Sequence, residues 1–231
     1  MFRTVLFLMT AALSTGAASD AHSIAAAFEA RYHHARTLKA AFFERYSDGN
    51  GGVAAESGTV YFSRPGRMRW EYESPEKKLF LVDGVSAWSY VPADHTASHA
   101  KMKESSDWRT PLALLTGKAS LDSLCRKIEI LDPKIADAKP EGKALSPGDT
   151  LLSCLPKGQP QSSEGSDRIV IEVSSLSQLV RVLIHSQGNT ETELRFENWE
   201  ENIDIPESQF HFQTPPGVAI VDVDDLANTI R

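Results

Sequence analysis

Basic residues are scarce in this sequence, which has 24 Lys and Arg against 31 Asp and Glu and a formal net charge of −7. Proteins that bind nucleic acid neutralise its phosphates with a basic face, so this charge balance excludes that class of function. An anionic membrane surface would repel the chain for the same reason. We therefore expect no nucleic-acid partner.

Short catalytic and metal-binding motifs are also missing. The sequence has no G-x-S-x-G nucleophile elbow, no H-E-x-x-H pair and no G-x-x-x-x-G-K-[ST] phosphate loop. His95 and His99 are four residues apart, but their context predicts strand or loop and offers no third ligand. We expect no metal site, no cofactor and no enzymatic activity. The alternative is an exported hydrolase that uses Asp and His residues outside known motifs.

No hydrophobic run reaches the roughly 20 residues that a membrane-spanning helix needs. The first run opens the chain: Arg3 supplies a positive charge, residues 4–13 are uncharged and mostly apolar, and small residues follow at 14–19. This order is typical of a secretory signal peptide. We expect residues 1–20 to be removed on export and residues 21–231 to form a single domain.

Cysteine is limited to two residues, Cys125 and Cys154. In the oxidising compartment that an exported protein reaches, such a pair predicts one disulfide, and two reduced, buried thiols are the alternative. The spacing is far from C-x-x-C, which argues against a redox-catalytic role.

The residues after the signal peptide predict a helix followed by a β-meander. Ile24, Phe28 and Tyr32 recur at four-residue spacing, with Ser23 as a candidate N-cap. From residue 38 the apolar period becomes two. Residues 67–73 give the clearest alternation, in which Met68, Trp70 and Tyr72 are separated by charged residues. The meander covers about residues 38–102, and its Asp83-Gly84 link is a strong hairpin signal.

The second half of the chain predicts one short helix and more strands. Thr110-Pro111 begins a helix that Gly117 ends. Polar stretches at 132–149 and 156–167 are interpreted as surface loops. Residues 210–218 are interpreted as a final strand and turn. The strand-like runs are 124–131, 150–155, 168–173, 179–185 and 191–199.

Large aromatic side chains are concentrated in the predicted meander. Aromatic residues on strands usually pack in a core, and this is the simplest interpretation of the pattern. A sheet of many strands with only two helices, however, offers more concave apolar surface than those helices can bury. The remainder must be closed by curvature or be available to a ligand. The residues are Phe42, Phe43, Tyr61, Phe62, Trp70, Tyr72, Phe80, Trp88 and Tyr90.

Three stretches of the sequence carry a family resemblance. Residues 57–72 read SGTVYFSRPGRMRWEY, residues 75–90 contain Pro75, Asp83-Gly84 and Trp88-Ser89-Tyr90, and residues 210–218 read FHFQTPPGV. Together they resemble the periplasmic outer-membrane lipoprotein carrier family, LolA. The resemblance runs from about residue 24 to residue 221 and is weak between 120 and 190.

The resemblance implies a mainly β (α+β) fold. A single antiparallel sheet would curve into an incomplete, half-open β-barrel, with the N-terminal helix and the short second helix as a lid. It implies a monomeric periplasmic carrier that shields the acyl chains of lipoprotein cargo in an apolar cavity. The carrier would receive cargo from an inner-membrane ABC lipoprotein-releasing transporter and deliver it to an outer-membrane lipoprotein receptor.

The resemblance also assigns roles to single residues. Arg64 becomes a latch that donates hydrogen bonds to lid carbonyls, although an exposed arginine in a loose ion pair is the plainer interpretation. Phe28, Leu112 and Leu115 become lid contacts, with ordinary core packing as an equal alternative. The residues expected to line the cavity are Phe62, Met68, Trp70, Tyr72, Phe80, Trp88 and Tyr90.

Other functions remain open for the same fold. A carrier of another lipid or glycolipid is one. An outer-membrane lipoprotein receptor is disfavoured because no lipid-attachment cysteine follows the signal peptide, and a periplasmic regulator of an envelope-stress pathway is disfavoured by the single domain. The polar 132–167 region and the cysteine pair depart from the family pattern.

Overall fold

The computed structural model describes residues 20–101, 114–132, 145–157 and 168–224. The predicted signal peptide up to residue 19, Leu112 and most of the 132–167 region lie outside these residues. The described strands are β1 (Thr37–Ser47), β2 (Val53–Ser63), β3 (Arg67–Ser74), β4 (Lys78–Val82), β5 (Ser86–Val91), β6 (Thr96–Lys101), β7 (Cys125–Leu131), β8 (Thr150–Pro156), β9 (Arg168–Val173), β10 (Leu179–Ser186), β11 (Thr190–Glu201) and β12 (Ala219–Asp222).

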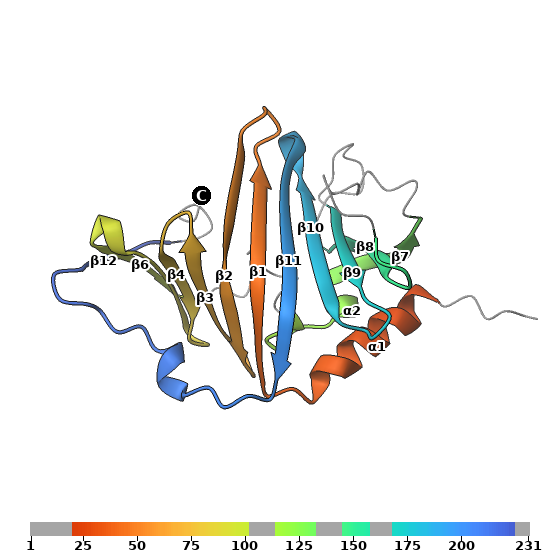
Figure 1. Ribbon diagram of the computed structural model, residues 1–231, viewed down its shortest axis with the longest axis horizontal. Helices are drawn as coiled ribbons and strands as arrows, with labels where there is room; N and C mark the ends of the chain where they lie inside the picture. The colour runs from red at the N-terminus through yellow and green to blue at the C-terminus, as the bar shows by residue number, and fades with distance from the viewer. Residues whose placement is uncertain (1–19, 102–113, 133–144, 158–167, 225–231) are drawn as a thin grey trace, which may run out of the picture.

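All of these strands belong to one twelve-stranded sheet in the order β12-β6-β5-β4-β3-β2-β1-β11-β10-β9-β8-β7. Neighbouring strands pair antiparallel, except that β12 pairs parallel with β6. The sheet curves across its width, and β12 and β7 stand at its two ends without pairing with each other (Figure 1). The expectation of a curved, unclosed antiparallel sheet with two helices is confirmed.

The N-terminal helix α1 (Ala21–His33) carries one buried stripe. Its buried residues are Ala21, Ala25, Phe28 and Tyr32, whose spacing places them on one helical face. The N-cap is Asp20, whose side chain accepts a hydrogen bond from the His22 amide. The predicted N-cap, Ser23, lies three residues later, inside the first turn, where its hydroxyl donates a hydrogen bond to the Asp20 carbonyl.

The region of the predicted second helix is only partly described. The predicted start at residues 110–111 lies outside the described residues, residues 114–117 form a turn, and the helix α2 is the short segment Leu121–Leu124. Ser120 and Ser123 bond reciprocally in a capping box that fixes where α2 begins. Gly117, which has a φ of +75°, is the last residue of the preceding turn.

The C-terminal tail also differs from its prediction. Residues 207–210 form a 3₁₀ helix, and the last strand, β12, begins only at Ala219. Pro215 and Pro216 have no backbone N–H, so this stretch cannot complete a strand ladder. Further 3₁₀ segments connect strands, Pro92–Asp94 between β5 and β6 and Gln187–Asn189 between β10 and β11.

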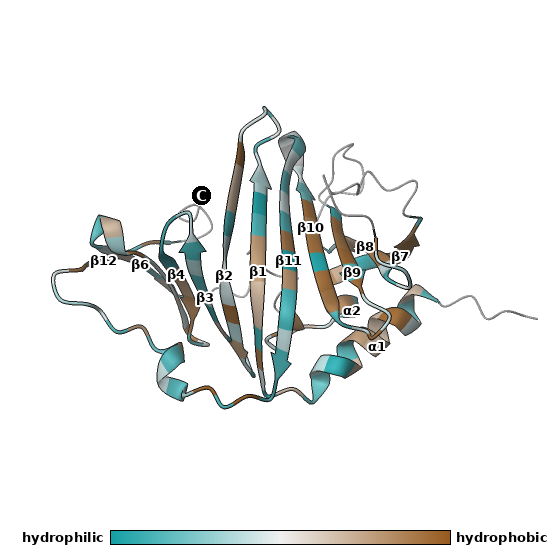
Figure 2. Ribbon diagram, viewed as in Figure 1, coloured by the Kyte–Doolittle hydropathy of each residue, from teal (hydrophilic) through white to brown (hydrophobic). Residues whose placement is uncertain are grey.

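The two faces of the sheet bury different side chains. The main core cluster joins alternate residues of the strands to α1, to Leu114 and Leu115, and to α2. We call the face that carries this cluster the concave face. Hydropathy colouring shows hydrophobic stretches along β9 and β10 and a more mixed pattern on the strands around β3 (Figure 2). A smaller cluster of Leu151, Val170 and Leu183 lies on the other, convex face.

Candidate functional site

Aromatic side chains gather on the concave face of β1 to β4. Trp70 is 1% exposed and lies opposite Val60 on β2 and Phe80 on β4. Phe62 lies opposite Met68, so both belong to the same face. The Trp70 ring centroid is 6.4 Å from that of Phe62 and 6.5 Å from that of Tyr72. The register therefore brings together five predicted cavity residues: Phe62, Met68, Trp70, Tyr72 and Phe80.

Two further aromatic residues complete this group, and the sequence analysis did not select them for the site. Phe42 on β1 makes edge-to-face contacts with Trp70 at 4.7 Å and with Tyr72 at 5.0 Å. Phe196 on β11 pairs with Phe42 in the ladder and lies 6.1 Å from Trp70. Leu38, Ala40 and Phe42 alternate on β1, and this period of two is the signal that could have identified Phe42.

Trp88 and Tyr90 are not part of this group, contrary to the sequence prediction. They lie opposite Leu81 and Leu79 of β4, whereas Phe80 lies opposite Ser89. Successive residues of a strand face opposite sides, so both rings lie on the convex face. There Phe212 stacks on Trp88 at 4.8 Å and contacts Tyr90 at 5.7 Å.

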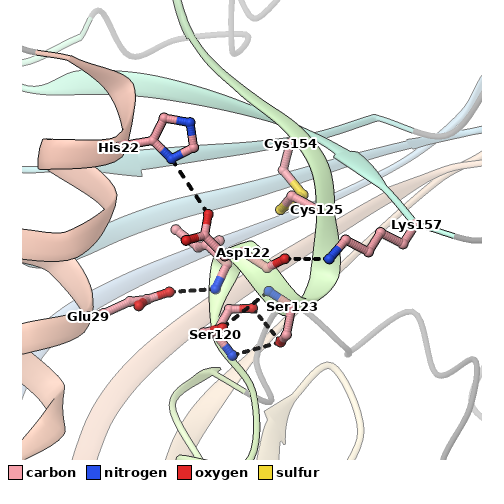
Figure 3. Close-up of a disulfide and its surroundings, with 9 residues drawn as sticks. His22, Glu29, Ser120, Asp122, Ser123, Cys125, Cys154 and Lys157 are labelled. Carbon is pink, nitrogen blue, oxygen red and sulfur yellow. Dashed lines mark hydrogen bonds and ion pairs between the residues drawn. A yellow bond between two sulfur atoms is a disulfide. The ribbon is translucent and has the colours of Figure 1, made fainter.

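Helical and turn segments cover the concave face. We call α1, residues 114–120 and α2 together the cover. The predicted lid contacts Phe28 and Leu115 are each 1% exposed and belong to the main core cluster. Within the cover, the Leu121 amide donates a hydrogen bond to the Glu29 carboxylate at 2.5 Å, and His22 Nδ1 lies 3.6 Å from the Asp122 carboxylate (Figure 3).

A disulfide ties the end of α2 to the sheet. Cys125 is the C-cap of α2 and the first residue of β7, and it is bonded to Cys154 on β8 with a Cα–Cα distance of 5.4 Å. Next to it, Lys157 Nζ donates to the Asp122 carbonyl at 2.6 Å (Figure 3). The Lys157 amide also donates to the Leu124 carbonyl at 2.9 Å. These bonds fix α2 on the β7–β8 end of the sheet.

The C-terminal end of α1 is held by β10 and β11. The Tyr32 hydroxyl accepts a hydrogen bond from the Leu179 amide at 3.0 Å, and burial raises the pKa of this phenol to about 12. The Tyr32 ring lies 5.8 Å from that of Trp199. Arg31 forms an ion pair with Glu201 at 2.6 Å. Tyr32 is thus an anchor of α1, a role that its place in an apolar stripe did not reveal.

Arg64 lies where the β2–β3 turn meets the cover. Its guanidinium donates a hydrogen bond to the Tyr32 backbone carbonyl, which is the kind of contact the family resemblance implied. Two residues later, the Gly66 amide donates to the Thr116 carbonyl at 2.9 Å. Partial burial lowers the pKa of the Arg64 guanidinium, which nonetheless stays charged at neutral pH. The turn therefore contacts both α1 and the 114–120 segment.

Gly117 allows this approach. A Cβ at this position would overlap the Arg64 guanidinium, and the residue has a φ of +75°. Only glycine satisfies both conditions without strain. The sequence pattern predicts Gly117 as a helix stop but carries no signal that it lies beside Arg64.

One end of the concave face is polar. The Tyr72 hydroxyl is 3.0 Å from the Glu44 carboxylate, and Lys78 forms an ion pair with Glu56 at 2.6 Å. The Lys78 ammonium also lies 4.2 Å from the centre of the Tyr72 ring. The concave face thus changes, along β3, from apolar at Met68 to charged beside Tyr72.

The described residues form neither a membrane-spanning helix nor a metal site. None of their helices is long and apolar enough to cross a membrane. Within the same residues, no group of three or more His, Cys, Asp or Glu side chains could hold a metal ion.

The chain is similar to known proteins over most of its length. Residues 33–138 match the family model of the outer membrane lipoprotein carrier protein LolA. The outer-membrane lipoprotein carrier protein of Dechloromonas aromatica is 29% identical over 187 residues, which cover 80% of this chain and 81% of the relative. The carrier of Chromobacterium violaceum is 26% identical over 223 residues, covering 94% and 97%.

Among solved structures, an uncharacterized conserved protein from Thermus thermophilus has a similar fold. It aligns with a TM-score of 0.52 at 11% identity, over 88% of this chain and 99% of that chain.

Proposed function

Because the chain matches the LolA family model and is similar to outer-membrane lipoprotein carriers over most of its length, we propose that it is a periplasmic carrier of lipoproteins. It shields the acyl chains of its cargo against the concave face and carries them from the inner to the outer membrane. Its partners are an inner-membrane ABC transporter that releases lipoproteins and an outer-membrane receptor that accepts them. This role requires binding and release but no reaction.

The observation that carries this proposal is the aromatic concave face beneath a separate cover. Phe62 and Trp70 are almost completely buried, and they belong to one core cluster with residues of α1, of the 114–120 segment and of α2. Each acyl methylene transferred from water contributes about 0.8 kcal/mol, so ten of them represent roughly 8 kcal/mol. Displacing the cover onto an acyl chain exchanges one apolar contact for another, which keeps binding reversible.

Arg64 acts as the latch in this mechanism. In the closed form its guanidinium donates a hydrogen bond to the Tyr32 carbonyl, and the Gly66 amide donates one to the Thr116 carbonyl. Acyl chains that enter under the cover break these hydrogen bonds, and the burial of the chains offsets the loss. On delivery the bonds re-form and favour the empty, closed carrier. Arginine suits this role because it presents several donors in a fixed plane and stays charged.

The proposal is tested with membrane vesicles that contain a triacylated lipoprotein and its transporter. Wild-type protein should bring the lipoprotein into the soluble fraction and then pass it to receptor-containing vesicles. The Arg64→Leu variant should still take up lipoprotein but fail to pass it on. Arg126→Leu, at an exposed position of β7, is the matched control and should transfer normally.

Three outcomes would change the assignment. If wild-type protein releases no lipoprotein from the vesicles, the carrier role is wrong. If it extracts a glycolipid instead, the cargo is that lipid. If Arg64→Leu transfers cargo as well as wild type, Arg64 is not a latch.

A further inference from the structure

The indole N–H of Trp70 has no hydrogen-bond partner among the described residues, although the side chain is only 1% exposed. Trp199 shows the usual arrangement, because its Nε1 donates to the Leu179 carbonyl at 2.8 Å. Buried N–H groups are nearly always paired, since leaving one unpaired costs its full desolvation. Trp70 therefore holds an unused donor inside the concave face.

Rings surround this donor. Phe42 lies 4.7 Å away and Phe196 6.1 Å away, measured between ring centroids. The hydroxyl of the next concave residue on the strand, Tyr72, is engaged with Glu44. The ladder neighbours of Trp70, Val60 and Phe80, have side chains without an acceptor oxygen. Among the described residues none supplies an acceptor to the indole, and the carbonyl of a bound ligand is a group that can.

The position of Trp70 on β3 indicates the chemistry of that acceptor. On one side lie buried Met68 and Phe62, and on the other lie Tyr72 and the Lys78–Glu56 ion pair. Trp70 is two residues from each of its neighbours on this face, or about 7 Å along the strand. In an acylated molecule, the ester carbonyl occupies the same place, between the apolar chain and the polar headgroup.

We propose that Trp70 Nε1–H donates a hydrogen bond to an ester carbonyl of the bound lipid anchor, so that the protein selects ester-linked acyl chains. This inference rests on the proposed carrier function and adds to it a residue that determines specificity. When the ester binds, the indole gains the acceptor that it lacks in the closed structure. The acyl chain then extends toward Met68 and Phe62, and the glycerol side faces Tyr72.

The test compares two lipopeptides in binding to the full mature protein. In one, the N-terminal cysteine carries a diacylglyceryl group with palmitoyl esters; in the other, hexadecyl ethers replace the esters. A hydrogen bond of ordinary net strength predicts that wild type binds the ester about fivefold more tightly, as measured by calorimetry. Trp70→Phe, which keeps an apolar ring but removes the donor, should bind both equally.

Trp88→Phe is the matched control, because the indole Nε1 of Trp88 is also buried without a partner in the described part of the chain but lies on the convex face. It should keep the wild-type preference. If wild-type protein binds the ester and the ether equally, the inference is overturned but the carrier role is not. The indole N–H would then be an N–H donor to the aromatic ring of Phe42 and not to a lipid. A preference that survives in Trp70→Phe would also overturn it. If wild type binds neither lipopeptide, the carrier function itself fails.

Discussion

The concave face has two halves that differ in side chains and in how they hold the cover. The aromatic half, on β1 to β4, presents Phe42, Phe62, Met68, Trp70 and Phe80. The aliphatic half, on β8 to β10, presents Leu152, Ile169, Ile171, Val182 and Ile184. Aliphatic side chains fill one half, whereas rings that meet mostly edge to face fill the other. In the proposed carrier function, the aliphatic half supports the fold and the aromatic half contacts the ligand.

The contacts of the cover show the same asymmetry. On the aliphatic side it is held by hydrogen bonds from Lys157 to α2 and by the hydrogen bond between Tyr32 and Leu179, beside the Cys125–Cys154 disulfide that joins β7 to β8. On the aromatic side it is held by hydrogen bonds from Arg64 and Gly66. The hydrogen bond between Tyr32 and Leu179 is buried, whereas that of Arg64 is only partly buried and is more easily replaced by water. The proposed opening therefore begins at the aromatic half.

Removing the disulfide should have the largest effect on stability. The bond closes a loop with a sequence separation of 29, and in the chain-entropy model its loss costs about 3–4 kcal/mol. We expect Cys125→Ala/Cys154→Ala to lower the free energy of unfolding in urea by this amount. Wild type in reductant is the control and should match the variant. An unchanged free energy of unfolding would show that the disulfide is not a main source of stability.

Tyr32→Phe should lower the free energy of unfolding by about 1–3 kcal/mol, because it leaves the Leu179 amide unpaired in a buried position at the end of α1. The raised pKa of Tyr32, about 12, adds a pH test. A raised folded-state pKa means that the folded protein keeps a proton that the unfolded chain releases, so this stabilisation is lost as pH rises through the folded value. Stability measured from pH 10 to 12 should therefore fall more steeply for wild type than for Tyr32→Phe. Parallel curves would contradict this.

Gly117→Ala should loosen the aromatic side of the cover at a cost of about 1–2 kcal/mol from the left-handed backbone, plus the displacement of Arg64. Hydrogen exchange of residues 114–124 should become faster, and binding of an acylated peptide should become easier. Gly188→Ala is the matched control, because Gly188 has the same φ of +75° with open space around it. If both variants change exchange in the cover equally, the contact with Arg64 is not what matters.

Glu207→Gln should have the smallest effect on stability and uptake. It removes an ion pair with Arg67 on the convex face, away from both halves of the concave face. Its hydrogen bond with Arg67 lowers the pKa of Glu207, so the small stabilisation is present above the ordinary pKa and lost as pH falls through the lowered value. Lipoprotein uptake should equal that of wild type, and the melting temperature should change little at neutral pH. A large loss of uptake would extend the functional surface to the convex face.

Sequence patterns identified the strands of both halves but not every facing. The alternation of Met68, Trp70 and Tyr72 with charged residues correctly placed them on one face. For Trp88 and Tyr90 the local alternation was right, yet their side of the sheet depends on the register across the Asp83-Gly84 turn. A shift of one residue in register moves a side chain to the other face, and nothing in the local sequence fixes that register.

The contacts of the cover were harder to foresee. The bonds of Arg64 with Tyr32 and of Tyr32 with Leu179 join residues far apart in the chain. The sequence indicated Arg64 only through the family resemblance. The position of α2 depends on the capping box of Ser120 and Ser123, two common residues in a polar stretch. Such pairings depend on tertiary structure and leave no periodic signal.

The most direct test of the account is photo-crosslinking of a diacylated peptide to the carrier. A photoreactive phenylalanine would replace Met68 in the aromatic half, Ile171 in the aliphatic half or Trp88 on the convex face. The account predicts the strongest acyl-dependent crosslink from position 68, a weaker one from 171 and none from 88, with no crosslink to the unacylated peptide. Crosslinking from position 88 with none from position 68 would contradict it.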